Sequence, residues 1–508
     1  MPINVLMLNP PYFPHFSKNS RSPAVSKGGC VYYPIWLGYA TGALELDGHH
    51  VKLVDATATP ITMDQVKHLA KEFNPKMIMM HTVTSSVVND AKVAHQLKEI
   101  LPHATIVMVG PHVSAVPHNT LEIAPAVDII ARKEYDLTAM DIAKWIEHGK
   151  DVEKLKDIKG ISYRDPKSKV ALHTPDREDV PADFLDKLPF ASEVWAKHLK
   201  IEDYFYPSVL YPEVTIITGR GCPFRCTFCD WPQNFTGHNF RSRSVKNIVD
   251  EFEWIKNNLP QVKDIMIEDD TFTLDKKRVR EIAEEVIRRN LKVTWTVNAR
   301  CDVDFETLQW MKKAGCRLVC VGVESSTQEI LNNIKKGTNV QKIEQFFDDT
   351  KKAGVLVHAC FMMGNRGETK ETIAKTVEFA KKVNPDTVQF FPIMVYPGTE
   401  AFEWAKTNGF LTTQKWDEWL LEDGTHNTIV STDKLSAKEL VDACDDARRS
   451  FYMRPRFIAE KIWEGITTPS EFPRLLKSGK TFFKYLFNTK EKVSLGSLRE
   501  DGNAPVSA

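Results

Sequence analysis

The sequence carries no excess of charge of either sign. Its 508 residues include 67 Lys and Arg against 67 Asp and Glu, so the formal net charge is zero. A broad phosphate-binding surface needs clustered positive charge, which argues against nucleic acid as a partner. The chain also lacks an apolar run of the roughly 18 residues that cross a bilayer, and it lacks a charged leader followed by an apolar stretch. These absences predict a cytoplasmic protein that does not bind nucleic acid.

Cysteine is scarce as well. There are nine cysteines, and three of them are clustered. An odd number in a long chain favours reduced thiols and a metal centre over a framework of disulfides, as in a reducing compartment. Hydrophobic residues make up 42% and charged residues 26%, which are ordinary values for a globular protein. A chain of this length is expected to form two or three domains.

The first third of the chain alternates short apolar strands with helices. We expect strands at residues 5–8, 51–55, 77–80, 105–109 and 129–130, and helices at 36–47, 63–73 and 87–101. This alternation predicts an α/β domain over residues 1–150 with a doubly wound, Rossmann-like parallel sheet. Ligands of such sheets bind beyond the carboxyl ends of the strands. No Gly-x-Gly-x-x-Gly fingerprint follows the first strand, which argues against a dinucleotide.

A second α/β pattern follows a connector. Residues 151–212 are expected to form the connector, with a small hairpin made by 154–163 and 170–173. Between 213 and 411 we expect six strands, at 213–218, 264–267, 294–297, 318–323, 355–362 and 387–392. With helices between them they predict a partial (β/α)6 barrel whose chemistry lies at the strand carboxyl ends. Residues 412–508 are expected to form a helical C-terminal domain, with helices at 436–453, 456–463 and 472–486.

One short segment, after the first of these six strands, carries a metal-ligand pattern. Cys222, Cys226 and Cys229 are spaced by four and three residues in a stretch that also holds Gly221 and Pro223, so a loop is expected. Zinc takes four ligands, and no second pair of Cys or His follows at the spacing of a zinc finger. A four-iron cluster on three thiolates leaves one iron open to a ligand. The alternative is three reduced thiols in a structural loop.

This Cys-x-x-x-Cys-x-x-Cys pattern resembles the signature of the radical S-adenosylmethionine (SAM) enzymes. The resemblance implies a 4Fe-4S cluster on Cys222, Cys226 and Cys229, whose open iron binds SAM. One electron then splits SAM into methionine and a 5'-deoxyadenosyl radical, chemistry that a side chain cannot supply. The resemblance also implies SAM contacts at the aromatic before the last cysteine and at the ends of the later strands: Phe228, Asp269, Asp270, Asn298, Arg300, Glu324, Ser325, Gly364, Gly367 and Glu368.

The first domain, placed before such a barrel, resembles the cobalamin-binding domain of one branch of that family. Better-known cobalamin domains donate a His from an Asp-x-His-x-x-Gly motif. The nearest stretch here, Asp-Gly-His-His-Val-Lys at 47–52, ends in Lys and lies before a strand. The resemblance therefore implies cobalamin held without that ligand, with contacts in the loops after the strands: Asn9, Pro10, Thr82, Thr84, Ser85, Ser86, Gly110, Pro111 and His112.

Three features leave two interpretations open. Residues 17–33, which include Lys18, Arg21 and Lys27, form either a flexible lid over the active site or a solvated loop. Residues 241–244 (Arg-Ser-Arg-Ser) either pair with carboxylates of SAM or phosphates of cobalamin, or begin a helix capped by Ser244. Four later cysteines either act as small hydrophobic residues in apolar strands or ligand a second cluster: Cys301, Cys316, Cys320 and Cys360.

Basic and aromatic residues alternate near the carboxyl end, at residues 474–487. Such a segment either docks on a membrane surface or a lipid substrate, or packs as a helix on the barrel. The residues after 492 are expected to be disordered.

The resemblance implies a cobalamin-dependent radical SAM enzyme. The commonest activity of that branch is methylation, here of an unactivated carbon in a lipid, a peptide or a natural product. A reducing partner such as flavodoxin or ferredoxin is expected. One alternative is a cyclase or ring-rearranging enzyme acting on a porphyrin- or hopanoid-type substrate. Another is a methylthiotransferase, which needs three more cysteines in the amino-terminal domain, where only Cys30 is present. The last is a non-enzymatic carrier of cobalamin or of an iron–sulfur cluster.

Overall fold

The computed structural model describes residues 1–468 apart from 27 and 166, together with 476 and 479. The chain divides into two compact units, Met1–Arg448 and Arg449–Ala508, and each is described by itself. The helix expected at 472–486, the basic and aromatic segment 474–487 and the tail after 492 lie outside the described residues. None of the described helices is both long enough and apolar enough to cross a membrane.

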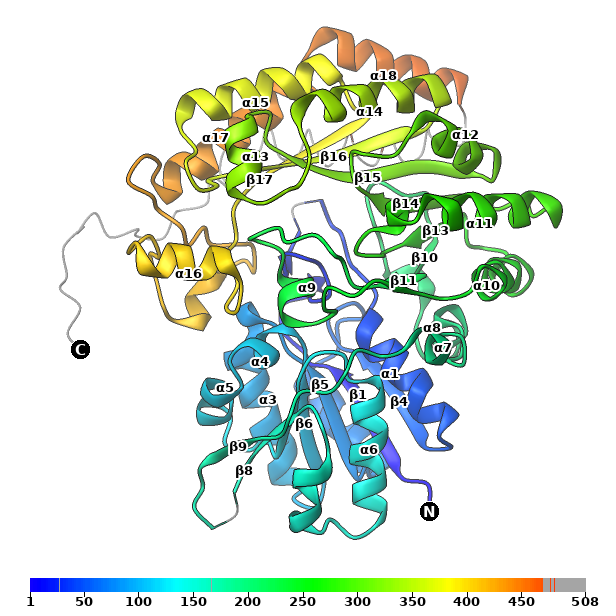
Figure 1. Cartoon of the computed structure of the whole chain (residues 1–508). Helices are drawn as coiled ribbons and strands as arrows, with labels where there is room; N and C mark the ends of the chain where they lie inside the picture. The colour runs from blue at the N-terminus through cyan, green and yellow to red at the C-terminus, as the bar shows by residue number, and fades with distance from the viewer. Residues whose placement is uncertain (27, 166, 469–475, 477–478, 480–508) are drawn as a thin grey trace. The chain divides into compact units, whose positions relative to one another are not determined.

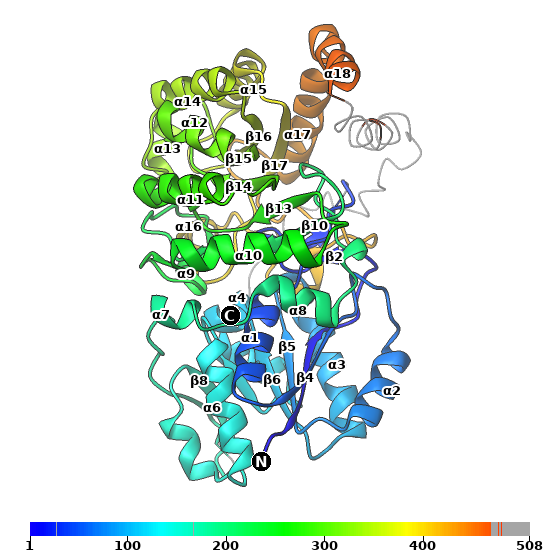
Figure 2. The same ribbon diagram turned by 90° about the vertical axis from the view of Figure 1, so that its right-hand side faces the viewer.

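The first sheet of the larger unit matches the pattern expected from the sequence. Its parallel strands β1 (Asn4–Asn9), β4 (His50–Asp55), β5 (Met77–His81), β6 (Thr105–Val109) and β7 (Ile129–Ala131) lie in the order β4-β1-β5-β6-β7. Helices α1 (Ile35–Leu46) and α6 (Asp136–Glu147) cover one face, and α2 (Met63–Phe73) and α3 (Val87–Ile100) cover the other (Figure 1 and Figure 2). The inner strands are buried on both faces, which explains their continuous apolar runs.

This sheet is wider than the sequence pattern predicted. β8 (Ile161–Arg164) and β9 (Ala171–His173) form the expected hairpin, but its first strand starts only at 161 because residues 152–157 form a short 3-10 helix. β8 pairs antiparallel with β7, so the hairpin extends the first sheet past residue 150. Two short helices, α7 (Ala182–Leu185) and α8 (Ala191–His198), then lead to the second sheet.

The second sheet is the predicted partial barrel. Its six parallel strands are β10 (Glu213–Ile216), β13 (Asp264–Ile267), β14 (Trp295–Ala299), β15 (Cys316–Glu324), β16 (Leu356–Met363) and β17 (Thr387–Pro392), neighbours in chain order. Their outer side carries α10 (Val245–Asn258), α11 (Lys276–Arg288), α12 (Phe305–Lys313), α14 (Val340–Ala353) and α15 (Lys370–Val383) (Figure 1 and Figure 2). Helical crossovers between neighbouring parallel strands bring every strand carboxyl end to one rim.

The helical prediction is wrong for residues 412–436. This segment contains a 3-10 helix, η5 (Trp416–Trp419), and two isolated bridges, Leu411 to Val430 and Leu420 to His426. Its apolar side chains are packed against the segment after β17, and a Glu-Asp-Gly turn at 422–424 reverses the chain. The helices predicted beyond it are present as α17 (Ala437–Tyr452) and α18 (Pro455–Thr467).

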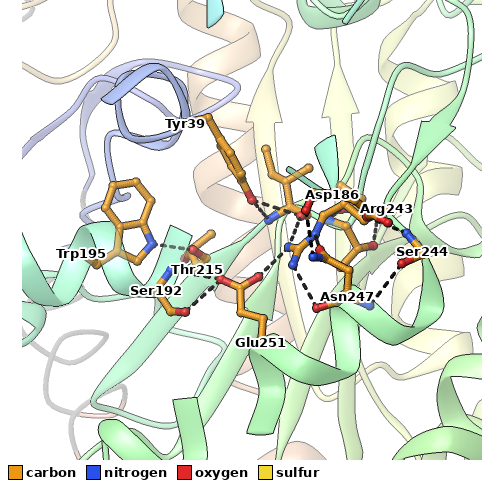
Figure 3. Close-up of polar contacts among 12 residues, drawn as sticks. Tyr39, Asp186, Ser192, Trp195, Thr215, Arg243, Ser244, Asn247 and Glu251 are labelled. Carbon is orange, nitrogen blue, oxygen red and sulfur yellow. Dashed lines mark hydrogen bonds and ion pairs between the residues drawn. The ribbon is translucent and has the colours of Figure 1, made fainter. Parts of the chain in front are cut away.

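Helix α1 joins the two sheets of the larger unit. The Tyr39 hydroxyl donates to the carbonyl oxygen of Ile217, 3.0 Å away, and accepts from the amide of the same residue at 2.8 Å (Figure 3). Trp195 of α8 donates to the carbonyl oxygen of Thr215 at 2.8 Å. A Cβ at Gly38 would lie 2.0 Å from the Trp195 ring, so α1 and α8 approach this closely only with glycine there.

In the Arg-Ser-Arg-Ser segment at 241–244, Arg241 and Ser242 form the short strand β12 and Ser244 starts a helix. Ser244 caps α10 by accepting a hydrogen bond from the amide of Asn247 (Figure 3). The buried Arg243 pairs with Glu251, which also accepts two hydrogen bonds from Ser192. Arg241 pairs with Glu134 at 2.6 Å. Both guanidinium groups are therefore used to hold elements together.

Candidate active site

The clustered cysteines lie in a loop whose backbone is fixed by hydrogen bonds. Gly221 has a φ of +83°, and a Cβ there would lie 2.1 Å from the carbonyl oxygen of Asn239, so the loop turns at a position that requires glycine. The side-chain amide of Gln233 donates to the carbonyl oxygens of Cys226, Thr227 and Cys229 at 2.9 to 3.2 Å. The amide of Thr227 donates to the carbonyl oxygen of Ile334 at 3.0 Å.

The three thiols form a donor set that fits an iron–sulfur cluster. Burial raises the pKa of Cys229, Arg21 opposes the shift, and the neighbouring thiol of Cys226 adds to it. Within the described chain, no three His, Cys, Asp or Glu side chains converge on one metal ion. A single ion draws its sulfur ligands to about 2.3 Å from itself, whereas a four-iron cluster places each thiolate on a separate iron. Three cysteines without a carboxylate or histidine match the second arrangement.

The acidic turn after β13 divides into structural and unengaged carboxylates. Asp269 accepts hydrogen bonds from the amide and the hydroxyl of Thr218, both at 2.6 Å. Asp270 accepts from the amide of Gly221 at 3.1 Å and from the hydroxyl of Thr236 at 2.8 Å. Both predicted SAM contacts therefore hold the cysteine loop against the barrel.

Glu268, next to them, has an atom left for a ligand. Its Oε2 has no hydrogen-bond partner among the described residues. Burial raises the pKa of Glu268 to about 7, against the opposing effects of Arg21 and of a hydrogen bond from Asn298. Asn298 is one of the predicted SAM contacts, so it lies beside this unengaged carboxyl group.

The ends of β14 and β15 bring cations to the cysteine loop. The Arg300 guanidinium lies 3.5 Å from the centre of the Phe224 ring and donates to the carbonyl oxygen of Lys336 at 2.6 Å. The Lys336 ammonium lies 2.7 Å from Glu324 and 5.9 Å from the ring of Phe228. Glu324 has a φ of +66°, a costly conformation for a residue with a side chain, which indicates a position fixed by its surroundings.

Lys336 was missed by the sequence analysis. It lies in a stretch that reads as the polar end of a surface helix, yet its side chain is buried beside Glu324. The signal that was available is the Lys-Gly pair at 336–337, which interrupts the helical pattern before α14.

The turn after β16 is folded around one carboxylate. One oxygen of Glu368 accepts from the amides of Gly364 and Asn365 at 2.7 and 3.0 Å, and its other oxygen has no partner in the described part of the chain. Burial raises the pKa of Glu368 to about 7, and Gly367 lies in the same turn. Ser325 differs from these residues, because it is fully buried and bonded to Thr376 and to the amide of Thr327.

The residues predicted to contact cobalamin lie together beyond β1, β5 and β6. The buried polar atoms in this region without a hydrogen-bond partner in the described residues include Asn9 Oδ1, His81 Nδ1 and His112 Nε2. Burial lowers the pKa of His81 and of His112 to about 3, so both rings are neutral. Buried polar groups without partners point to a polar ligand, and the amide groups of a corrinoid match them in chemistry.

The space above these loops is filled by residues 12–26, which we call the strap. Lys18 of the strap lies 2.8 Å from Asp90 of α3, and both side chains are fully buried. The Ser85 hydroxyl donates to the carbonyl oxygen of Pro23 at 3.0 Å. At its other side the strap reaches the barrel, where Arg21 lies 3.1 Å from Asp270 and 4.2 Å from the centre of the Trp231 ring. The strap is therefore a largely buried segment and not a solvated loop.

A small cavity, with room for about one water molecule, remains where the strap meets both sheets. The first sheet contributes His81, Val83, Thr84 and Pro111, the barrel Asp230, Trp231 and Tyr396, and helix α1 Trp36; the strap supplies the rest. The structure therefore brings the predicted Thr84 and Pro111 together with the residues that follow Cys229. This space is far smaller than the roughly 300–1,000 Å³ of ligand pockets and does not hold a corrinoid, so the residues fit this cofactor and the remaining space does not.

The later cysteines behave as apolar residues. Cys301, Cys316 and Cys320 are buried in or beside β14 and β15, and Cys360 lies in β16. Burial raises the pKa of Cys301 and of Cys360 to about 12, so these thiols stay protonated at neutral pH. Their places in apolar strands and their protonated thiols favour the role of small hydrophobic residues over that of ligands to a second cluster.

Two family matches cover the two sheets. Residues 216–380 match the Radical SAM superfamily, and residues 21–143 match the B12 binding domain. The Radical SAM domain uses a 4Fe-4S cluster with SAM, and the B12 binding domain uses cobalamin, so these are the cofactors of this chain.

Similar proteins cover nearly the whole chain. An uncharacterized methyltransferase of Pyrococcus horikoshii, PH0819, is 30% identical over 437 residues, 85% of this chain and 90% of that protein. The anaerobic magnesium-protoporphyrin IX monomethyl ester cyclase of Rubrivivax gelatinosus is 27% identical, over 84% of this chain and 74% of that enzyme.

Among solved structures, the radical SAM methyltransferase TsrM of Kitasatospora setae superposes with a TM-score of 0.64 at 19% identity. The match covers 81% of this chain and 77% of TsrM, which shows a shared fold. The fold, the two domain matches and the full-length similarity agree, and the chain belongs to the cobalamin-dependent radical SAM enzymes, in the methyltransferase-like branch.

Proposed function

We propose that the chain transfers a methyl group to an unactivated carbon of a lipid, a peptide or a natural product. When bound, SAM and the cluster supply a radical that removes a hydrogen atom, and cobalamin supplies the methyl group that replaces it. The observation that carries this proposal is that residues next to Cys229 and residues of the cobalamin loops line one small cavity. A substrate bound at this junction would meet groups from the cysteine loop on one side and from the cobalamin loops on the other.

We assign the cluster to Cys222, Cys226 and Cys229. The hydrogen bonds from Gln233 and the contact between Thr227 and Ile334 hold the loop in place before any metal binds. A rigid loop lowers the conformational cost of binding, since its residues are already ordered.

The SAM site is proposed at the rim of the barrel beside this loop. Glu268 and Glu368 offer carboxyl oxygens without partners among the described residues, and Arg300 and Lys336 offer cations. A zwitterion such as the methionyl part of SAM needs one of each. We assign Phe228 to the adenine side, and Asn298, Glu324, Gly364 and Gly367 complete the rim. Asp269, Asp270 and Ser325 support this site from behind.

The cobalamin site is proposed at the carboxyl ends of the first sheet. Its polar contacts are Asn9, Thr82, Thr84, Ser85, Ser86 and His112, and Pro10, Gly110 and Pro111 shape its wall. The unpartnered atoms of Asn9 and His112 support this assignment. A cyclase or ring-forming reaction is the second candidate function, favoured by the similarity to the protoporphyrin ester cyclase.

Two measurements test the function. Reconstituted protein is mixed with a low-potential reductant and SAM carrying a deuterated methyl group, and cell extracts from a strain lacking the protein are analysed by mass spectrometry. Methyl transfer predicts 5'-deoxyadenosine and a product heavier by one labelled methyl group in place of hydrogen. A product that has lost hydrogen atoms and carries no labelled methyl group supports cyclisation. Absence of deoxyadenosine supports a carrier and contradicts both enzymatic functions.

A cysteine exchange tests the cluster assignment separately. Cys226→Ser is expected to lose most of the iron and the absorbance of the reconstituted cluster, because a thiolate is removed from the ligand set. Cys360→Ser is the matched control, since that thiol lies in β16, outside the loop, and it should keep both. Equal iron content in the two variants contradicts the assignment.

Partners follow from the same chemistry. We propose that flavodoxin or ferredoxin supplies the electron and that the protein works in the cytoplasm, where such donors are reduced.

We further propose a peripheral membrane contact through the carboxyl-terminal region. Three isoleucines of α18 at a spacing of four residues, Ile458, Ile462 and Ile466, are exposed at 40%, 60% and 68% and support it.

A further inference from the structure

We propose that the strap occupies the place of the corrinoid in the cofactor-free protein and is displaced when cobalamin binds, with Lys18 and Arg21 as its two latches. The inference rests on cobalamin being the ligand of the first sheet.

The position of the strap follows from the topology of the sheet. The connections from β1 and β5 run to opposite sides, because β4 lies beyond β1 and β6 lies beyond β5. In open parallel sheets the ligand binds at this switch point, outside the strand carboxyl ends. The strap begins immediately after β1 and covers the loop after β5, where Tyr12 donates to the carbonyl oxygen of Ser85 at 3.4 Å. It therefore covers the place where the topology puts a ligand.

The first latch is a buried ion pair. Lys18 contacts both oxygens of Asp90, at 2.8 and 2.9 Å, and Asp90 also accepts from the hydroxyl of Ser86 at 2.7 Å. Burial lowers the pKa of Lys18 and raises that of Asp90, and each partner opposes the shift of the other. Taking charges out of water is costly even when they are paired. When the strap leaves, both charges are hydrated again, and this hydration offsets part of the free energy lost with the ion pair.

An apolar contact adds to this latch. Phe16 and Ala24 of the strap pack with Val83, in the loop after β5, and with Leu420. The strap is also bonded to the segment around residue 424, where the amide of Val25 donates to the carbonyl oxygen of Gly424 at 2.8 Å. A corrin ring offers a large apolar surface that can replace these contacts.

The second latch couples the two cofactor sites. Arg21 donates to Asp270 at 3.1 Å and to the carbonyl oxygen of Asp269 at 3.2 Å, and its Nε lies 3.7 Å from Glu268. Its guanidinium therefore offsets the negative charge of the turn that contains Glu268, whose Oε2 has no partner among the described residues. When the strap leaves with Arg21, the Asp270 carboxylate loses its cationic partner beside the proposed SAM site. Cobalamin binding is then expected to favour the ammonium group of SAM, because the two equilibria share one element.

The ends of the strap are anchored, so its displacement is local. On one side the chain is fixed by β1. On the other side Val31 is paired with Phe205 through two backbone hydrogen bonds, and α1 follows. Only about residues 12–30 are free to move as a loop.

Hydrogen–deuterium exchange on the natural protein tests the displacement. The apoprotein is compared with the same protein saturated with hydroxocobalamin. We expect at least a tenfold faster exchange in peptides covering residues 12–26 after loading, and slower exchange in the loop at 82–86, which then contacts the corrinoid. Slower exchange in both segments means that the strap stays in place as a wall of the site and overturns the proposal.

A reversible cross-link gives a second test. Pro23→Cys with Ser85→Cys places thiols on two residues already in contact, since the Ser85 hydroxyl donates to the main-chain carbonyl oxygen of Pro23 at 3.0 Å. With the disulfide confirmed by mass spectrometry, the locked protein is expected to retain less than a tenth of the hydroxocobalamin held by the reduced protein after gel filtration. Addition of dithiothreitol should restore binding. Full binding to the locked protein overturns the strap, whereas no binding to the natural protein overturns the cofactor assignment itself.

Discussion

At the scale of single residues, the charges around the cysteine loop are already paired with one another. Arg21 faces Asp270, Lys336 faces Glu324, and Arg278 faces Asp269. Paired charges remain in place without a ligand, which keeps the site ordered. A ligand that binds here must exchange one of these partners, so replacement of a single charge is expected to affect binding as well as folding.

Lys336→Met tests the cation that sequence analysis missed. Loss of the ammonium leaves Glu324 without its partner at 2.7 Å and removes a candidate contact of the SAM carboxylate. We expect SAM affinity to fall about tenfold, which corresponds to about 1.4 kcal/mol, with the cluster retained. The measurement is isothermal titration of SAM into the reconstituted protein. Lys336→Arg, which keeps the charge, should recover most of the affinity, and equal affinities in all three proteins would contradict the role.

His112 provides a test by pH. Its folded pKa of about 3 lies below the roughly 6.5 of an unfolded histidine. The unfolded chain therefore binds more protons between these values, and stability falls as the pH drops below about 6.5. Between pH 7.5 and pH 5.5 this single group should lower the free energy of unfolding by about 1.4 kcal/mol. The difference between natural protein and His112→Gln in urea unfolding at both pH values isolates this effect from other titrating groups. A constant difference at the two pH values argues against a neutral buried ring.

The sequence located the site residues better than it located their roles. Cys222, Cys226 and Cys229 were recognisable from spacing alone, because the pattern is local. Asp269 was placed correctly at a strand end, but its bonds to Thr218 connect residues 51 positions apart, and no local pattern encodes such a contact. Lys336 was not predicted for the same reason, because a helix separates it along the chain from its partner Glu324.

At the scale of elements, a clear hydrophobic pattern makes a strand or helix easy to predict. α2 (Met63–Phe73), β6 (Thr105–Val109), β13 (Asp264–Ile267) and β17 (Thr387–Pro392) have the bounds that the sequence indicated. The hairpin β8–β9 was predicted, but its pairing with β7 was not, because register between distant strands depends on tertiary packing. Residues 412–436 were assigned to a helical domain, whereas the turn at 422–424 and two isolated bridges give this segment an irregular path.

The start of α10 offers a test at this scale. Arg243→Met leaves Glu251 buried without its partner, and removal of one member of a buried pair costs about 3–5 kcal/mol. Lys246→Met is the matched control, because that lysine is 80% exposed and pairs with Asp250 on the same helix, a contact worth less than about 0.5 kcal/mol. Urea unfolding of the apoproteins measures both. Similar losses in the two variants would contradict a structural role for the Arg243 pair.

At the scale of the whole molecule, the candidate site lies entirely in the larger unit. Every assigned residue falls between Asn9 and Glu368, well before the division at Arg448. The smaller unit begins within α17 and contains α18. Cofactor binding is therefore a property of the first unit, and the second is available for other contacts.

The exposed face of α18 tests the membrane contact. Ile462→Glu with Ile466→Glu places two charges on side chains exposed at 60% and 68%. If this face meets lipid, flotation with vesicles containing phosphatidylserine should fall at least fivefold, because charged groups are poorly accommodated at an apolar interface. Deoxyadenosine formation should be unchanged. Unaltered flotation, or a loss of thermal stability instead, assigns these isoleucines to packing within the protein.

Gly38 carries a consequence for how the two cofactors are spaced. Since α1 is locked against α8 at this glycine and bonded to the barrel through Tyr39, the two sheets share a rigid spine and have no joint at which to bend. The distance over which a methyl group is transferred is then set by this framework. Substrates of different thickness have to be accommodated by the loops at the rim, and variation among related enzymes is expected there while the spine stays unchanged.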